Sequence, residues 1–212
     1  LAIFFTLLIV LASAISTIAY ANGMIPENRM RLLIFGQFLA VLISALLGSF
    51  QLIQGMADLF KGRFTINTLL TITFFACCAD GVFCLMQLRV PCCAAFSLEM
   101  TMALWARLQK RNTEMAQMDT LRKAVRLDSL VKQPEYLDGK PGILRGEGQV
   151  EDFMDIYEAP TGPERVQSFY AIISLLVCVG IAALAGVMHG ASMAVQILAT
   201  SLLVAIPAGF FV

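Results

Sequence analysis

Charged residues are scarce in this sequence. Lys, Arg, Asp and Glu make up 14% of its 212 residues, whereas soluble domains usually carry about 25%. Hydrophobic residues make up 58%, and the mean hydropathy is +0.78. This composition excludes an ordinary soluble domain and indicates an integral membrane protein, with the lipid bilayer as its main surrounding. The net charge is zero, which by itself says nothing about nucleic-acid or acidic partners. For a membrane protein of this kind we expect no nucleic-acid partner.

The chain also lacks the residue sets on which large enzyme families depend. His189 is its sole histidine, so there is no zinc-protease histidine pair and no Ser-His-Asp set. No glycine-rich phosphate-binding loop is present. We therefore expect no catalytic residue and no organic cofactor within these 212 residues, and no ATP hydrolysis by this chain alone.

Cysteines are present, but not in the pattern of a secreted disulfide framework. The six are Cys77, Cys78, Cys84, Cys92, Cys93 and Cys178. All lie in or beside apolar runs, and adjacent cysteines rarely bridge each other. We expect most of them to pack as small hydrophobic side chains.

Six apolar runs approach the roughly 20 residues that a membrane-spanning helix needs. They cover residues 1–21, 32–57, 65–88, 91–108, 168–188 and 190–212. The fold class predicted is an all-α polytopic membrane protein with about six transmembrane helices and one small α/β insertion. Its parts are four helices in two hairpins at 1–106, the insertion at 107–167 and a last helix pair at 168–212. Both ends fall inside apolar runs, so we expect a fragment of a longer polypeptide.

Small residues recur every fourth position in the second of these runs. They are Gly36, Ala40, Ser44 and Gly48. Such a ridge lets membrane helices approach one another closely. We expect this face to be a helix–helix contact.

The basic residues are distributed unevenly between the two sides of the membrane. With alternating spans, twelve Lys and Arg fall on the side of the insertion and three on the other side. The positive-inside rule places the more basic side in the cytoplasm. We expect a bacterial plasma-membrane protein whose residues 107–167 are cytoplasmic.

The insertion has its own secondary-structure signals. Apolar positions from Met115 to Leu130 predict a helix that continues the fourth span until Pro134 stops it. The Asp138-Gly139 pair predicts a turn in a short hairpin. Thr161 and Glu164 have the spacing of a capping box at the start of the fifth span.

Two carboxylic acids lie within predicted spans, where an ionisable group is costly. Asp80 shares one helical face with Cys77 and Cys84, at the spacing i, i+3 and i+7. Glu99 lies on the next helix, seven residues after Cys92. Thiolate and carboxylate together suit a divalent ion such as Zn, Cd or Cu. Cys77, Asp80, Cys84 and Glu99 are therefore candidate metal ligands.

A structural explanation of the same two acids stays open. Asp80 would be hydrogen-bonded or hydrated near the outer mouth of the helices, beside Gly81. Glu99 would cap a helix or pair with Arg89. Neither acid then touches a metal ion.

A proline interrupts the last apolar run. Pro207 cannot donate a hydrogen bond to the carbonyl of Leu203, and its ring displaces that carbonyl. In lipid such a carbonyl is tolerated where protein or a water-lined cavity surrounds it. Pro207 therefore marks either a tolerated kink or a site.

The order of these segments is similar to a known family. The relevant stretches are "FKGRFTINTLLTITFFACCADG", "SLEMTMALWARLQKR" and "ILATSLLVAIPAGFFV". Together they resemble the N-terminal membrane half of heavy-metal-transporting P-type ATPases. The resemblance implies a transition-metal or other cation as cargo, an ion-pathway kink at Pro207, and catalytic domains downstream in the same polypeptide. The family's Cys-Pro-Cys is replaced by Ile206-Pro207-Ala208, and the segment 107–167 is shorter than the family's actuator domain.

Two functions follow from this resemblance. The first is the membrane part of a divergent cation pump, which is an ATPase only if a phosphorylation domain follows residue 212. The second is a non-catalytic pump remnant or membrane scaffold with a partner-binding cytoplasmic segment. A six-helix ABC-type exporter core fits less well, because only the fourth span continues into a long cytoplasmic helix.

Overall fold

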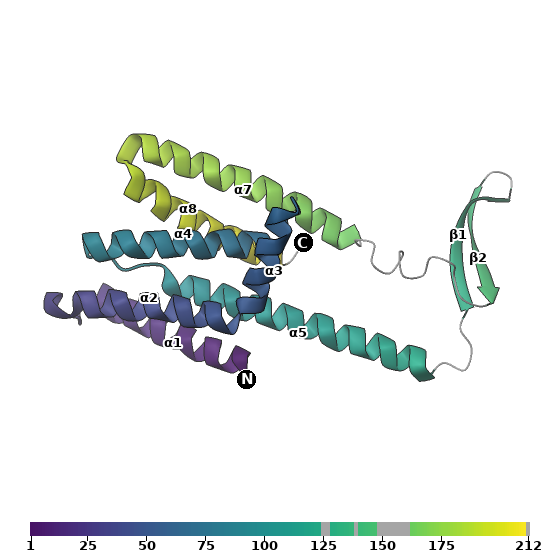
Figure 1. The fold of residues 1–212 in the computed structure, drawn as a ribbon, viewed down its shortest axis with the longest axis horizontal. Helices are drawn as coiled ribbons and strands as arrows, with labels where there is room; N and C mark the ends of the chain where they lie inside the picture. The colour runs from purple at the N-terminus through teal and green to yellow at the C-terminus, as the bar shows by residue number, and fades with distance from the viewer. Residues whose placement is uncertain (124–127, 138–139, 148–161, 211–212) are drawn as a thin grey trace. The chain divides into compact units, whose positions relative to one another are not determined.

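The computed structural model describes residues 1–123, 128–137, 140–147 and 162–210 (Figure 1). The helices are α1 (Ala2–Ala21), α2 (Met30–Leu47), α3 (Ser49–Phe60), α4 (Ile66–Gln87), α5 (Cys93–Lys123), α7 (Gly162–His189) and α8 (Ala191–Gly209), and the strands are β1 (Asp128–Leu137) and β2 (Lys140–Glu147). A short 3-10 helix, Glu27–Arg29, precedes α2. The chain divides into one unit of Leu1–Arg107 with Gly162–Val212, and a second unit of Leu108–Thr161.

The first unit is an all-α bundle, as the composition predicted. Within the described residues, five helices are long and apolar enough to cross a membrane: α1, α2, α4, α7 and α8. The predicted spans 1–21, 65–88, 168–188 and 190–212 each coincide closely with one of them. The prediction of a helical integral membrane protein is confirmed.

The predicted fourth span, 91–108, is not among these five helices. It forms the first half of the continuous helix α5, where Ser97, Glu99 and Thr101 interrupt the apolar run and Arg107 follows. This part of α5 is nonetheless packed inside the bundle, with Phe96 and Met100 fully buried. The composition of this segment is too polar for a lipid-facing span. Neighbouring helices enclose it instead.

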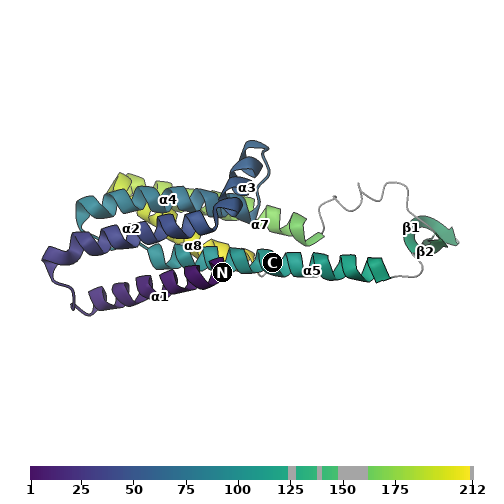
Figure 2. The same ribbon diagram turned by 60° about the horizontal axis from the view of Figure 1, so that its bottom comes forward.

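The predicted second span, 32–57, is wrong as a single helix. It is two helices, α2 and α3, separated at Gly48, whose φ of −100° and ψ of 18° depart from helical values. A Cβ at Gly48 would overlap the buried side chain of Met100 in α5, so any larger residue there requires Met100 to move. After the break α3 crosses the long helices steeply (Figures 1 and 2).

The core of the bundle is centred on α4. Half of the span in α4 is buried, compared with 11% in α1. Leu69 and Leu70 of α4 pack with Phe96 of α5 and with Leu202 and Ile206 of α8 in one apolar cluster. α4 also contacts α2, α3 and α7, whereas α1 packs along α2. α4 is therefore the helix whose side chains other helices enclose.

The ridge of small residues serves two different neighbours. The Ser44 hydroxyl donates a hydrogen bond of 3.0 Å to the Ser97 hydroxyl in α5, and Gly48 touches Met100. Gly36 and Ala40 face a hollow beside α1 instead. The predicted helix contact is thus confirmed for the second half of the ridge.

The second unit contains an antiparallel hairpin of β1 and β2. Its register pairs Asp128 with Glu147 and Leu137 with Lys140, which confirms the hairpin predicted around residues 138–139. The predicted helical continuation of the fourth span is confirmed as far as Lys123, where α5 ends, but its predicted extent toward Pro134 is wrong because Pro134 lies in β1. The pairing is irregular between Gln133 and Leu137. A proline fits such a stretch because it has no N–H to donate to a regular ladder. The predicted cap at Thr161 lies outside the described residues.

Candidate functional site

The candidate ligands of α4 share one helical face, as their spacing predicted, and the structure shows that this face is buried. Cys77, Asp80 and Cys84 are 6%, 2% and 0% exposed. Residues at i, i+3 and i+7 lie above one another on a helix, and this side of α4 is turned into the bundle. Asp80 is therefore a carboxyl group enclosed by apolar helices.

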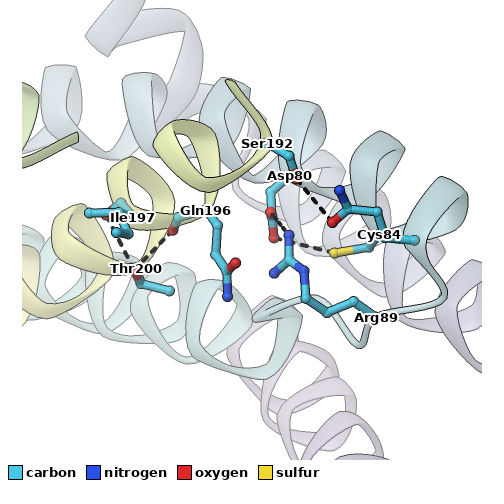
Figure 3. A network of polar contacts seen from close by, with 8 residues as sticks. Asp80, Cys84, Arg89, Ser192, Gln196, Ile197 and Thr200 are labelled. Carbon is cyan, nitrogen blue, oxygen red and sulfur yellow. Dashed lines mark hydrogen bonds and ion pairs between the residues drawn. The ribbon is translucent and has the colours of Figure 1, made fainter. Parts of the chain in front are cut away.

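Asp80 has an ion-pair partner from the loop that follows its own helix. α4 ends at Gln87, and Leu88 adopts a left-handed conformation with a φ of 54°. This residue reverses the chain, so that the backbone N–H of Arg89 donates to the carbonyl of Cys84 over 3.1 Å. The reversal carries the Arg89 side chain back over the end of α4. Its Nη2 lies 2.6 Å from Oδ1 of Asp80 (Figure 3).

The second oxygen of Asp80 also has a partner. The thiol of Cys84 donates to Oδ2 over 3.5 Å. Both carboxylate oxygens are therefore engaged, one by a guanidinium and one by a thiol. The two members of the ion pair differ in exposure, because the Arg89 side chain is 24% exposed and that of Asp80 only 3%. Nε of Arg89 has no hydrogen-bond partner in the part of the chain that the structure describes.

Cys92 lies close enough to Asp80, Arg89 and Cys84 to interact electrostatically with each of them. Even so, no three His, Cys, Asp or Glu side chains among the described residues converge as ligands around one metal ion. The structure therefore brings Asp80 and Cys84 into contact and places Cys92 nearby. It does not gather the four predicted ligands into one cluster.

Glu99 is buried without the partner that the structural explanation gave it. It is 2% exposed, and neither carboxyl oxygen has a hydrogen-bond partner within the described residues. Arg89 pairs with Asp80 instead. Gln51 of α3 is similar: it is 3% exposed, and both its amide oxygen and its amide nitrogen are unpartnered in the described chain. The sequence analysis did not single out Gln51.

α8 adds a polar edge to the site that the sequence analysis missed. Ser192 donates to Oε1 of Gln87 over 3.0 Å, which ties the start of α8 to the end of α4. Gln196 and Thr200 follow at steps of four residues, and the Thr200 hydroxyl donates to the Gln196 carbonyl over 2.9 Å (Figure 3). Polar residues every fourth position in an apolar helix were the available signal.

Pro207 lies far from Asp80 along the bundle. The helix α8 continues through it to Gly209. A Cβ at Gly209 would overlap Ile66, the first residue of α4. Asp80 is fourteen residues further along α4, or about 21 Å by the helical rise. The predicted kink and the predicted ligands are thus near opposite ends of α4.

Helix α7 supplies hydrogen bonds to the carbonyls around Pro207. The Tyr170 hydroxyl donates to the carbonyl of Ala205 over 2.8 Å. The Gln167 amide donates to the carbonyl of Gly209 over 3.0 Å. These bonds tie α7 to the last turn of α8, but neither side chain donates to the Leu203 carbonyl, which is the one that Pro207 leaves without its helical donor.

No family model, no curated protein and no solved structure matches this chain.

Proposed function

We propose that this chain is the membrane-embedded part of a cation transporter of the heavy-metal P-type ATPase kind, divergent in its ion ligands. The observation that carries this proposal is the burial of two carboxyl groups, Asp80 and Glu99, among apolar helices. Each such group costs at least a few kcal/mol in a membrane interior, so it needs a functional reason. A pathway for positive charge is the reason most consistent with acids on adjacent helices.

In this proposal Arg89 is a tethered counter-cation that the transported ion displaces. The guanidinium is partly exposed and comes from a loop, so it is free to swing toward the aqueous interface. Its departure leaves Asp80 with an unpaired oxygen beside the Cys84 thiol. An incoming divalent ion then binds carboxylate and thiolate, and the thiol proton is released to water.

Metal titration of the purified chain in lipid nanodiscs tests this mechanism. Cd²⁺ bound to a thiolate gives an ultraviolet charge-transfer band, which reports binding directly. We expect Arg89→Gln to bind Cd²⁺ about tenfold more tightly, because its internal competitor is gone. Asp80→Asn and Cys84→Ser should weaken binding, and Cys84→Ser should also reduce the band. Cys178→Ser, at a buried thiol of α7, is the matched control and should leave both unchanged.

A second function has its own supporting observation. Asp80 is already neutralised by the chain's own Arg89, which is what a static structural ion pair requires. In this alternative the chain is a non-catalytic scaffold or pump remnant. It predicts that Arg89→Gln gains no affinity for Cd²⁺ and only loses stability. That result would reject the transporter mechanism.

The pump assignment and the orientation have separate tests. Reading the parent transcript past Val212 should reveal an Asp-Lys-Thr-Gly-Thr phosphorylation segment if the chain is the front half of a P-type pump. A reporter enzyme that is active only in the cytoplasm should be active when it is fused within the second unit. A reporter that is active only outside the cytoplasm should be inactive there. A reading frame without that aspartate would reject the P-type ATPase assignment, whatever the outcome of the metal titration.

A further inference from the structure

An open groove runs between α1 and α2, away from the Asp80 site. Its volume is about 510 Å³. Small or apolar side chains line most of it, including Ala12 and Ile9 of α1 and Gly36 and Ala40 of α2. Arg29, in the short 3-10 helix before α2, lines it at the end nearest the hairpin turn.

Polar contacts hold the two helices at this separation. Nε2 of Gln37 donates to the hydroxyls of Ser16 and Thr17 over 2.8 and 2.9 Å. It also lies 3.4 Å from the carbonyl of Ser13. Both hydroxyls donate in turn to that carbonyl. These bonds fix the position of α1 on α2. The groove stays open because Ala12, Gly36 and Ala40 have side chains too small to fill it.

The groove therefore has apolar walls and one cationic end. The hydrogen atoms of the Gln37 amide are directed at α1, so within the described groove the positively charged group for an anion is Arg29. Arg29 is exposed, and no side-chain hydrogen bond or ion pair is recorded for it in the described chain. An occupant that matches both features has an apolar chain and an anionic head.

We propose that this groove binds one acyl chain of an anionic phospholipid, with the lipid phosphate at Arg29. The charge of the guanidinium complements the phosphate, and Arg is well suited to phosphate oxygens. The position of Arg29 agrees with this, since it lies at the end of an apolar hairpin where a lipid headgroup would be. This proposal is independent of the transport mechanism, because it uses none of the residues around Asp80.

Native mass spectrometry of the chain, released from nanodiscs of mixed phosphatidylglycerol and phosphatidylcholine, tests the proposal. The wild type should retain one phosphatidylglycerol in preference to phosphatidylcholine. Arg29→Gln should lower that preference about fivefold, the effect of one basic residue near a membrane surface. Arg31→Gln is the matched control: Arg31 is exposed two residues away but does not line the groove, and the preference should hold.

A second pair of variants tests the groove itself. Gly36 lines the groove and a Cβ there meets nothing within 4 Å, so Gly36→Phe begins its side chain in open space and adds a ring at the groove. It should abolish lipid retention, whereas Leu46→Phe, at an exposed position of α2 outside the groove, should not. The proposal is overturned if Gly36→Phe retains lipid like the wild type, or if both lipids are retained equally. It is also overturned if the chain is a lipid-free dimer whose contact Gly36→Phe disrupts.

Discussion

Arg89→Gln should destabilise the bundle more than Asp80→Asn, although both substitutions break the same ion pair. The atoms in contact are 2.6 Å apart, but only Arg89 is partly exposed. After Asp80→Asn the guanidinium can turn toward water or lipid headgroups. After Arg89→Gln the Asp80 carboxylate stays enclosed, where a charge without a partner is very unfavourable.

The magnitudes follow from this asymmetry. Removing one partner of a buried pair costs about 3–5 kcal/mol, because the other charge is left uncompensated. We expect Arg89→Gln near the lower end, about 3 kcal/mol, because the Cys84 thiol still donates to Oδ2. Asp80→Asn should cost about 1 kcal/mol, the usual net value of a lost hydrogen bond.

Reversible unfolding of the purified chain in mixed micelles, followed by circular dichroism, measures these free energies. The double variant Asp80→Asn with Arg89→Gln should be more stable than Arg89→Gln alone, because it removes the orphaned charge. Arg31→Gln, at an exposed arginine, should change stability by less than about 0.5 kcal/mol. Additive losses in the double variant, or a larger loss for Asp80→Asn than for Arg89→Gln, would refute the reasoning.

Three further predictions concern the packing of the bundle. Gly48→Leu should destabilise the bundle in the same unfolding assay, because its side chain overlaps that of Met100; partial recovery in Gly48→Leu with Met100→Ala would confirm the cause. Tyr170→Phe should cost about 1 kcal/mol in the same unfolding assay, since it removes the hydrogen bond to the Ala205 carbonyl. Gln37→Leu should loosen α1, measured as faster amide hydrogen exchange in α1 with α4 unchanged.

Parts of the fold were predictable because local composition decides them. A run of about 20 apolar residues in lipid must satisfy its backbone groups internally, which in a single segment means a helix. The shared face of Cys77, Asp80 and Cys84 followed from helical periodicity alone, whereas its burial did not. The hairpin followed from the Asp138-Gly139 turn signal, because such a pair favours a tight reversal between strands.

Other parts depended on contacts between distant residues. The contact between Gly48, at the break between α2 and α3, and Met100 of α5 joins residues far apart in the sequence, and residues 32–57 alone do not reveal it. The polar edge of α8 became recognisable only in the tertiary structure, where Ser192 donates a hydrogen bond to Gln87 at the end of α4. The burial of the polar first half of α5 depended in the same way on neighbouring helices.

The sequence by itself determined that this is a helical membrane protein and that its acids Asp80 and Glu99 lie on consecutive helices. Only the tertiary structure decided how those acids differ. The left-handed turn at Leu88 brings Arg89 to Asp80, whereas Glu99 is enclosed with no hydrogen-bond partner in the described chain. Periodicity assigns a residue to a face of its own helix, but the partner of a buried charge depends on how loops and neighbouring helices meet in space.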